Sequence, residues 1–196
     1  MTTLIATLVV AYLLGGVPTA YLLGKRWHNA DIRTLGSHNV GTSNAAKSFG
    51  PRAGAIVLLG DATKGALAAG VAVALDLPPW GAAMVALAVV AGHNFSPYLR
   101  LSGGRGVATA LGVSTIMVPA VAVVGLIVGA AWFVGTRNIV GAGVLAFAVT
   151  NVLVVATGAP MPVLAMCGAV SMLVLGTHLA RERSGTRRTA VVEVVR

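Results

Sequence analysis

Two glycine-rich polar segments interrupt an otherwise apolar chain, and their residue types could bind phosphate groups. The first segment is Gly36–Lys47 and the second is Ser102–Thr109. Each joins a glycine-containing turn to a stretch of helix-forming residues, and each carries a cation, Lys47 or Arg105. A turn that leads into a helix directs backbone N–H groups and the positive end of the helix dipole at an anion. The two segments therefore predict an enzyme or carrier that handles phosphates.

The side chains in these segments also have purely structural interpretations. Ser37 could bind a phosphate or a substrate hydroxyl group, or it could cap the following helix, because serine is a preferred N-cap residue. Asn39 and Asn44 could hydrogen-bond a polyol, or they could stabilise the turn through bonds to the backbone. Gly103 and Gly104 would supply either a positive φ or a close backbone approach.

Four more polar residues lie within or at the end of apolar segments. His178 could be a phosphate ligand, a proton shuttle, an interfacial histidine or a cation at a helix C-terminus. His93 could line a pocket or support it by hydrogen bonding. Asp61 and Lys64 lie three positions apart inside an apolar segment, where charged groups are costly unless they are paired. This spacing favours a structural ion pair beneath the site.

The composition indicates a single integral membrane domain, over residues 1–180, followed by a basic cytoplasmic tail, over residues 181–196. Hydrophobic residues make up 57% of the chain and charged residues only 10%, whereas soluble domains carry about 25% charged residues. The formal net charge of +9 comes largely from short segments between apolar runs, so it does not indicate nucleic-acid binding. The single cysteine, Cys167, allows no internal disulfide.

The apolar runs predict an all-α protein with about seven transmembrane helices, some of them short, and cytoplasmic glycine-rich re-entrant turns. Pro119 predicts a break in the longest run, because proline removes a backbone donor and clashes with the preceding turn. With this break, the Lys and Arg residues of the loops fall on one side. The positive-inside rule then puts both turns and the C-terminus in the cytoplasm and the N-terminus outside. The predicted spans are residues 3–23, 53–75, 80–98, 106–117, 119–135, 139–156 and 161–178.

Several reaction types are disfavoured by what the sequence does not contain. Its 5 acidic residues are scattered, so no carboxylate cluster is available for Mg²⁺ or a two-metal site. No Cys and His residues have the spacing of a zinc site. The His-x4-Asp motif of many glycerolipid acyltransferases is missing, as are a Walker loop and a nucleophile elbow. We therefore expect no metal and no cofactor.

The order and spacing of the motifs resemble the acyl-phosphate:glycerol-3-phosphate acyltransferases of bacterial membranes, the PlsY family, over nearly the whole chain. The family motif Gly-Ser-x-Asn-x-Gly-x-(Thr/Ser)-Asn-x-x-Arg is similar to Gly36–Lys47. Its Asp-x-x-Lys-Gly stretch resembles Asp61–Gly65, and its Gly-Gly-Lys-Gly-Val-Ala-Thr motif resembles Gly103–Thr109. The closing family motif begins with a histidine at the end of the last span, here His178.

Four positions depart from the family pattern. Lys47 replaces an arginine and Arg105 replaces a lysine, which keeps the charge but exchanges fork and point-charge donors. His38 stands where glycine is usual. The family pattern His-x-x-Asn places an asparagine where this chain has Arg181.

The resemblance implies a bacterial plasma-membrane enzyme that is independent of acyl-CoA and catalyses the first step of phospholipid synthesis. It would transfer an acyl chain from acyl phosphate to the 1-hydroxyl group of sn-glycerol 3-phosphate, giving lysophosphatidic acid and inorganic phosphate. Its partners would be these substrates and membrane lipid, with the protein acting as a monomer. The implied catalytic residues are Ser37, Lys47, Arg105 and His178; the substrate-binding residues are Gly36, Asn39, Gly41, Thr42, Ser43, Asn44, Gly103, Gly104, Gly106, Thr109 and Arg181; the supporting residues are Asp61, Lys64 and His93.

Three alternatives stay open. A small-anion transporter could also place half-helix N-termini around a polar cavity, although we find no inverted repeat and the outer halves of the spans are almost wholly apolar. A paralogue with a changed acceptor, or a non-catalytic lipid-binding scaffold, would fit a closing motif altered at Arg181.

Overall fold

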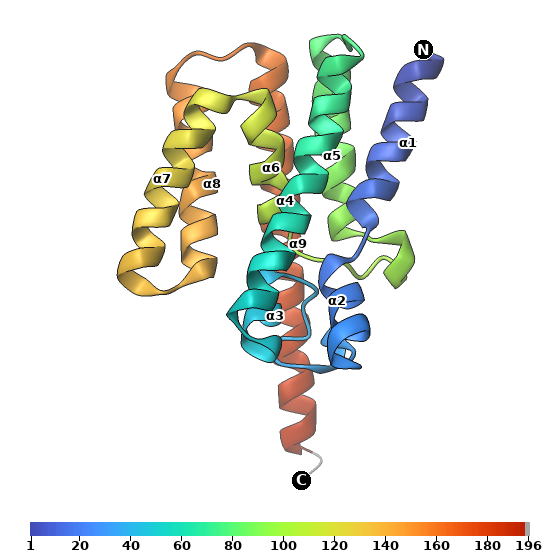
Figure 1. The fold of residues 1–196 in the computed structure, drawn as a ribbon, viewed down its shortest axis with the longest axis vertical. Helices are drawn as coiled ribbons and strands as arrows, with labels where there is room; N and C mark the ends of the chain where they lie inside the picture. The colour runs from blue at the N-terminus through green and yellow to red at the C-terminus, as the bar shows by residue number, and fades with distance from the viewer. Residues whose placement is uncertain (195–196) are drawn as a thin grey trace.

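The computed structural model describes the backbone of residues 1–194 and the side chains of residues 1–181. The described chain is helical, without β-strands. Helices α2 (Thr19–His28) and α3 (Thr42–Phe49) lie at one end of the molecule, and the last helix extends beyond them (Figure 1). Two short 3-10 turns, η1 (Ile32–Thr34) and η2 (Pro97–Leu99), lie in the connections. The helices along the long axis are α1 (Thr2–Gly16), α4 (Pro51–Ala74), α5 (Pro79–Asn94), α6 (Val107–Met117), α7 (Pro119–Thr136), α8 (Ile139–Ala156) and α9 (Met161–Val194) (Figure 1).

Six helical segments of the described chain are long and apolar enough to cross a membrane. Helix α6 is apolar but has only 11 residues, which corresponds to about 16 Å at 1.5 Å per residue, against a hydrocarbon core of about 30 Å. The predicted count of seven depends on this short helix and stays a prediction. The six segments are Thr2–His28, Pro51–Ala74, Pro79–Leu99, Pro119–Thr136, Ile139–Ala156 and Met161–Arg181.

The longest apolar run is broken where the sequence predicted. Helix α6 ends at Met117 and α7 begins at Pro119. Proline is tolerated at the first position of a helix, where its missing N–H would have no partner. The run therefore becomes a short helix followed by a separate hairpin of α7 and α8, rather than one long span.

The first predicted span is matched by an apolar segment, Thr2–His28, but a break divides this segment into two helices. Helix α1 ends at Gly16 and α2 begins at Thr19. Pro18 interrupts the hydrogen-bond ladder between them, because it has no backbone N–H and its ring clashes with the preceding turn. The break leaves the carbonyl of Val17 outside the helix, and Nζ of Lys64, on α4, donates a hydrogen bond to it.

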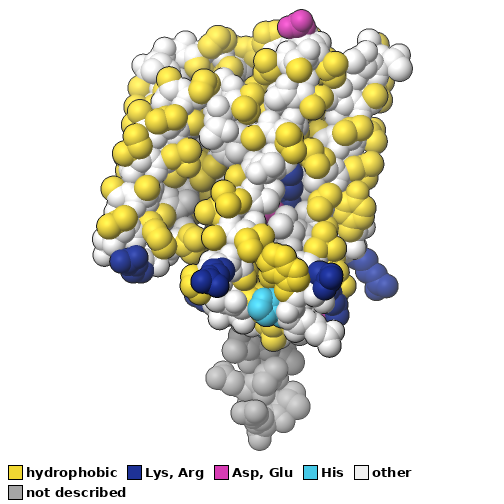
Figure 2. All heavy atoms as spheres, viewed as in Figure 1, with side chains coloured by type: hydrophobic (Ala, Val, Ile, Leu, Met, Phe, Trp, Pro, Cys, Tyr) yellow, Lys and Arg dark blue, Asp and Glu magenta, His cyan; other side chains and the backbone are white. Residues whose placement is uncertain are grey.

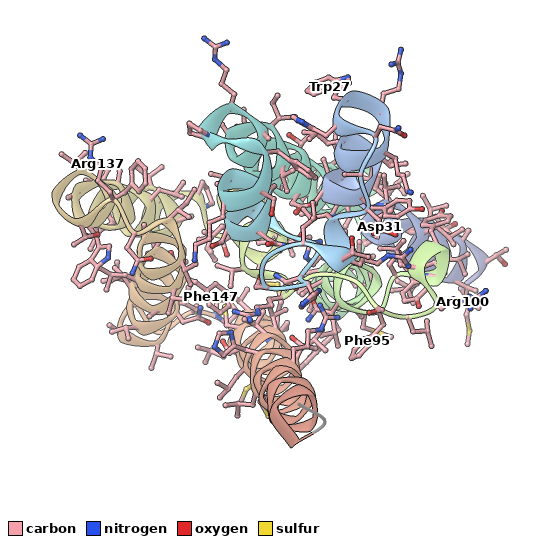
Figure 3. The ribbon with its side chains drawn as sticks, turned by 90° about the horizontal axis from the view of Figure 1, so that it is seen from below. Trp27, Asp31, Phe95, Arg100, Arg137 and Phe147 are labelled. Carbon is pink, nitrogen blue, oxygen red and sulfur yellow. The ribbon has the colours of Figure 1, made fainter. Side chains whose placement is uncertain are left out.

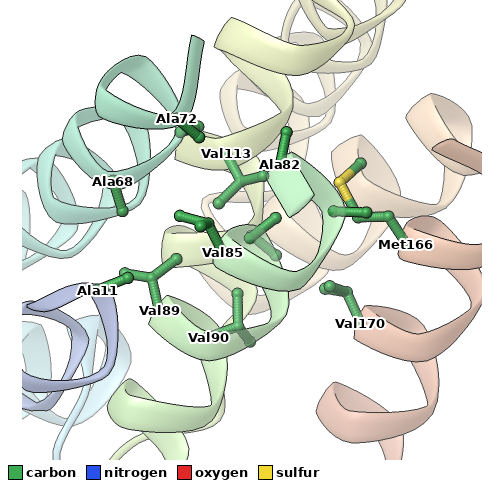
Figure 4. Close-up of a cluster of buried hydrophobic side chains, with 14 of the residues drawn as sticks. Ala11, Ala68, Ala72, Ala82, Val85, Val89, Val90, Val113, Met166 and Val170 are labelled. Carbon is green, nitrogen blue, oxygen red and sulfur yellow. The ribbon is translucent and has the colours of Figure 1, made fainter. Parts of the chain in front are cut away.

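Small residues allow the central helices to pack closely, as expected for membrane helices. The backbone of Val89 leaves no room for a side chain at Gly15, and the carbonyl of Ala62 leaves none at Gly112. The core between α4, α5, α6 and α9 consists largely of alanine and valine side chains, some of which are drawn in Figure 4. This packing fixes the ends of α5 and α6, from which the second glycine-rich segment extends.

Surface charge is distributed unevenly along the long axis. In Figure 2, the Lys and Arg side chains at the surface gather at the end where α2 and α3 lie, and an acidic side chain stands at the opposite end. This agrees with the charge asymmetry that the sequence predicted. The backbone of α9 continues as helix to Val194, whereas the side chains of the predicted basic tail beyond Arg181 lie outside the described residues.

Candidate active site

A cavity of about 120 Å³ lies where the two glycine-rich segments meet. One part of its wall is polar and the other is apolar, so it could hold a molecule with a charged head and a hydrocarbon chain. The polar wall comprises Asn39, Gly41, Thr42, Ser43, Asp61, His93, Arg105, Gly106 and His178. The apolar wall comprises Leu58, Val107, Ala108, Leu111, Ile139, Val140, Gly143 and Val144.

Two helix N-termini open into this cavity. Helix α3 begins after Gly41, and its first residues, Thr42 and Ser43, line the wall. Helix α6 begins after Gly106, and Val107 and Ala108 line the wall. The first N–H groups of a helix have no intrahelical partner, and the helix dipole favours an anion there. The sequence thus correctly predicted that both glycine-rich segments lead into helices whose N-termini converge.

Asn44 has the structural role that the sequence left open. Its side-chain Nδ2 lies within hydrogen-bond distance of the carbonyl oxygens of Ile32 (3.1 Å) and Asn39 (2.9 Å). Its Oδ1 accepts a hydrogen bond from the backbone N–H of Ser37 at 3.1 Å. Asn44 is buried, and its side-chain polar atoms hydrogen-bond to the loop backbone. It therefore shapes the first segment rather than facing a substrate. Gly36 serves the same arrangement, because a side chain there would collide with Oδ1 of Asn44.

In the second segment, the backbone N–H groups of two glycines that were predicted to face an anion donate to protein carbonyls instead. The N–H of Gly103 donates to the carbonyl of Asn94 (3.1 Å), and that of Gly104 donates to the carbonyl of His93 (2.9 Å). These two N–H groups are therefore engaged, and the glycines permit close approach to the end of α5 instead. Gly106 alone of the segment's glycines has a positive φ, of 86°. The donors facing the cavity belong to the first turn of α6.

Three buried polar atoms around the second segment lack a hydrogen-bond partner among the described residues. They are Nε of Arg105, Oδ1 of Asn94 and Oγ1 of Thr109. Buried polar groups are nearly always hydrogen-bonded, so each exception requires an explanation. Arg105 lines the cavity, and an anion bound there could accept a hydrogen bond from its Nε.

The predicted ion pair beneath the site is confirmed. Nζ of Lys64 lies 2.8 Å from Oδ1 of Asp61, and both side chains are buried. The same Asp61 oxygen accepts a hydrogen bond from Oγ1 of Thr19 at 3.0 Å. Nδ1 of His93 lies 3.7 Å from it. Asp61 and His93 both line the cavity, so the network connects the cavity wall to the break between α1 and α2.

The remaining predicted residues fall into two groups. His178 lines the cavity from α9. Ser37 and Lys47 are exposed and lie outside the cavity lining, and Ser37 does not cap α3, whose N-cap is Gly41. Their catalytic roles stay predictions. Arg181 also lies outside the lining, and it donates hydrogen bonds to three groups of the protein.

Sequence reasoning missed two parts of the site. Thr19 had no motif to mark it, because its contact with Asp61 depends on the break at Pro18. The apolar wall could have been anticipated in part. Leu58 lies three positions before Asp61 and Leu111 four positions after Val107, and such spacings place two residues on one face of a helix.

Charged residues outside the site lie at the rim of this end of the molecule. Viewed along the long axis, Arg137 and Arg100 lie at opposite edges of the bundle and point away from its centre (Figure 3). Both side chains are exposed. They are suitable controls for substitutions of the arginines inside the site.

The fold and the site define a class of protein: an all-helical membrane protein in which two helix N-termini and a guanidinium group face one cavity with an apolar wall. The sequence matches the glycerol-3-phosphate acyltransferase family over residues 5–188. The chain belongs to this family.

Individual relatives support this assignment. A glycerol-3-phosphate acyltransferase of Thermus thermophilus is 35% identical over 191 residues, which are 96% of each chain. One of Rubrobacter xylanophilus is 36% identical over 184 residues, covering 92% of this chain and 90% of that protein. Glycerol-3-phosphate acyltransferase 5 of Dehalococcoides mccartyi is 44% identical over 118 residues, which are 60% of this chain and only 51% of that protein.

The fold is shared with a solved structure. The crystal structure of PlsY (YgiH), an integral membrane glycerol 3-phosphate acyltransferase, in its glycerol 3-phosphate form, has a TM-score of 0.82 to this chain. The two sequences are 29% identical, and the match covers 96% of this chain and 92% of that chain. The lysophosphatidic acid form of the same protein has a TM-score of 0.78.

Proposed function

We propose that this protein transfers an acyl chain from an acyl phosphate to the 1-hydroxyl group of sn-glycerol 3-phosphate, producing 1-acyl-glycerol 3-phosphate and inorganic phosphate. The observation that carries the proposal is the two-sided cavity in a chain of this family. Its polar wall offers two helix N-termini and Arg105 to phosphate groups, and its apolar wall is drawn from α4, α6 and α8. An acyl phosphate needs both kinds of wall at once.

The two phosphates would be held at different helix ends. The first turn of α6 and the guanidinium of Arg105 would hold the donor phosphate, because Arg105 directly precedes the helix N-cap, Gly106. The first turn of α3, with Asn39 and His178, would hold glycerol 3-phosphate on the facing wall. Binding both reactants in one cavity supplies proximity, which can lower a barrier by several kcal/mol, up to about 7–11 in the best cases.

The reaction then requires one bond to form and one to break. The 1-hydroxyl oxygen attacks the carbonyl carbon of the mixed anhydride, and the bond from that carbon to the phosphate oxygen breaks. The phosphate leaves with the electron pair, and a phosphate oxygen accepts the hydroxyl proton. Arg105 and the N–H groups of α6 would stabilise the negative charge on the leaving phosphate.

Ser37 and Lys47 belong to the proposal as residues at the approach to the cavity. Both are exposed residues of the first segment, and we propose that they meet glycerol 3-phosphate as it enters. Ser37→Ala tests this directly. Full activity in that variant would exclude an essential serine and an acyl-serine intermediate.

We propose that the site faces the cytoplasm of a bacterial plasma membrane, with the N-terminus outside. The clustering of surface Lys and Arg at the end where α2 and α3 lie supports this orientation (Figure 2), because such residues favour the cytoplasmic side. We also propose that a single chain is the active unit.

A small-anion transporter is disfavoured by the packing behind the site. A carrier needs a polar path through the membrane, whereas buried side chains such as Val85, Val89 and Val113 fill the space between the central helices (Figure 4). The apolar wall of the cavity also has no use in the transport of inorganic phosphate.

The test is phosphate release by the purified protein in lipid, with palmitoyl phosphate as donor. We expect release only when glycerol 3-phosphate is also present, and none with palmitoyl-CoA as donor. Release without an acceptor, or no release from a folded protein, would contradict the proposal.

Substitutions of Arg105 locate the reaction in the cavity. Arg105→Ala should lower kcat/KM by about 100-fold or more, as removal of a charge-stabilising donor does. Arg105→Lys should retain most activity, because the family pattern has lysine here. Arg137→Ala, at the rim, should behave as wild type. Equal activity of all three variants would place the chemistry elsewhere.

A further inference from the structure

The guanidinium group of Arg181 joins three segments that are distant in sequence. Its Nη1 donates to Oδ1 of Asn39 at 3.2 Å and also to the carbonyl oxygen of Gly103. Its Nη2 donates to the carbonyl oxygen of Asn94 at 2.7 Å. Asn39 belongs to the first glycine-rich segment, Gly103 to the second, and Asn94 ends α5. One side chain on α9 thus contacts both glycine-rich segments and the end of α5.

The same region is reinforced by a second contact from α9. Nδ2 of Asn94 donates to Oγ1 of Thr177 at 3.1 Å. Thr177 and Arg181 are four positions apart, so they lie on one face of α9. His178, one position after Thr177, lines the cavity instead. On α9, His178 therefore lines the cavity, whereas Thr177 and Arg181 hydrogen-bond to Asn94, which supports the second segment.

Arg181 is engaged by the protein and not by the cavity. Both of its terminal nitrogens have protein acceptors, and the residue is absent from the cavity lining. Arg105 shows the opposite arrangement, because it lines the cavity and its Nε has no acceptor in the described part of the chain. The two arginines lie close enough for their charges to act on each other.

An asparagine could not make this set of contacts. Its amide carries two donors on one nitrogen, whereas a guanidinium carries five donors in a rigid planar fork. The family pattern has asparagine at this position, so Arg181 is a departure that adds hydrogen bonds between the loops. A decayed motif would have lost such contacts.

We propose that Arg181 is a positioning residue: it clamps the Gly103 and Asn39 segments together and thereby holds Arg105 in place for the leaving phosphate. This inference rests on the proposed acyl transfer for its kinetic consequences, but the clamp itself is a property of the two loops. The role first predicted for Arg181, direct contact with substrate, is replaced by one that acts through Arg105.

The clamp is tested without catalysis by hydrogen–deuterium exchange in lipid nanodiscs. Arg181→Lys keeps the charge but loses the fork. We expect faster exchange of the amides in residues 36–41 and 103–106, with unchanged exchange in the centre of α5. Arg137→Lys, a matched change at the rim, should leave all of these amides as in wild type. Unchanged exchange in both loops of Arg181→Lys would overturn the clamp, whatever the activity of the protein.

The kinetic arm separates positioning from substrate binding. A misplaced catalytic group can cost about 100-fold in rate, so we expect Arg181→Lys to lower kcat by about 10- to 100-fold with a smaller change in KM for glycerol 3-phosphate. In an Arg105→Ala background, Arg181→Lys should then cause little further loss, because residues that act as a unit are non-additive. A raised KM with unchanged kcat, or full additivity, would assign Arg181 to substrate binding instead.

These outcomes also separate the two proposals. If the wild-type protein is inactive but amide exchange in the loops is faster in Arg181→Lys, the proposed acyl transfer is contradicted and the clamp is supported. If the wild-type protein is active but amide exchange in the loops of Arg181→Lys is unchanged, the acyl transfer is supported and the clamp is contradicted. If the planar fork positions the loops, guanidinium ion should restore part of the activity of Arg181→Ala. Arg137→Ala is expected to be fully active, so guanidinium ion should leave its activity unchanged.

Discussion

The imidazole ring of His93 occupies the space that a β-carbon on Gly104 would need. On the other side of the ring, Oδ1 of Asp61 lies 3.7 Å from Nδ1. The second glycine-rich segment therefore rests directly on a side chain of the buried charge network. Gly104 has no positive φ, so its backbone conformation does not require glycine. Glycine is required because the His93 ring leaves no room for a side chain.

Gly104→Ala should disturb the site through this contact. The added methyl group must displace His93 or the loop, and such overpacking costs about 1–3 kcal/mol. We expect a lower melting temperature and a larger fractional loss of activity than of folded protein. Gly135→Ala is the control, because the described residues leave open space around a β-carbon there. Equal behaviour of the two variants would show that the loop can shift freely.

Lys64→Met should be strongly destabilising. Lys64 is the ion-pair partner of the buried Asp61 and also donates to the carbonyl of Val17 at 3.0 Å. Removal of one partner from a buried ion pair typically costs about 3–5 kcal/mol, because the other charge stays buried. Thermal unfolding in detergent measures the loss, and Lys25→Met, at an exposed position, should have little effect. The double variant Asp61→Asn with Lys64→Met should be more stable than Lys64→Met alone; a further loss would contradict the pairing.

His38→Gly should be tolerated and His38→Val should not. His38 has a φ of 58°, which explains why the family pattern has glycine there. The left-handed conformation costs an L-residue about 1–2 kcal/mol, and a β-branched residue tolerates it least. Glycine removes that cost but also removes the contact of Nδ1 with the carbonyl of Arg33 at 2.8 Å. We expect unfolding midpoints near wild type for glycine and clearly lower for valine. The reverse order would refute the backbone argument.

Acid should weaken the turn before the first segment. Asp31 accepts hydrogen bonds from the side chain of Arg33 and from its backbone N–H. Its pKa is lowered from 3.8 to about 2, chiefly by the Arg33 side chain. A lowered pKa in the folded state means that the carboxylate stabilises the fold above about pH 4, and this contribution is lost as the pH falls through about 2.

The measurement for this pair is the melting temperature between pH 5 and pH 2. The decline over this range should be smaller for Asp31→Asn than for wild type, because the variant has no carboxylate to protonate. The difference should be modest, since partly exposed ion pairs contribute about 1 kcal/mol or less. Asp76→Asn, at an exposed position with a φ of 47° that asparagine accepts well, is the control. Parallel declines for wild type and Asp31→Asn would show that the pair does not stabilise the turn.

Local features of this chain were predictable where one residue decides them. Pro119 predicted its helix break, and the spacing of Asp61 and Lys64 predicted their ion pair, because both effects act within a few residues. The convergence of the two glycine-rich segments followed from charge asymmetry and topology. These arguments depend on apolar length and on loop composition, which the sequence shows directly.

Features that depend on packing between distant segments were not predictable. The sequence suggested that the N–H groups of Gly103 and Gly104 face an anion, but those groups donate to the end of α5. For Asn44 the sequence left both a substrate-binding and a turn-stabilising role open, and for Arg181 it predicted substrate binding. Neighbouring backbone carbonyls accept hydrogen bonds from both side chains. A donor's partner is decided by which backbone comes near it, and sequence spacing does not contain that information.

The bond from Lys64 to Val17 makes one contact of the first span depend on a later segment of the chain. The two residues are 47 positions apart, so the break between α1 and α2 has no lysine to meet its carbonyl while only the first span has left the ribosome. The backbone N–H of Thr19 also donates to this carbonyl, at 3.2 Å, so Lys64 is its second donor. The carbonyl therefore gains its second donor, and the break its hydrogen bond to α4, only when α4 lies beside the first span.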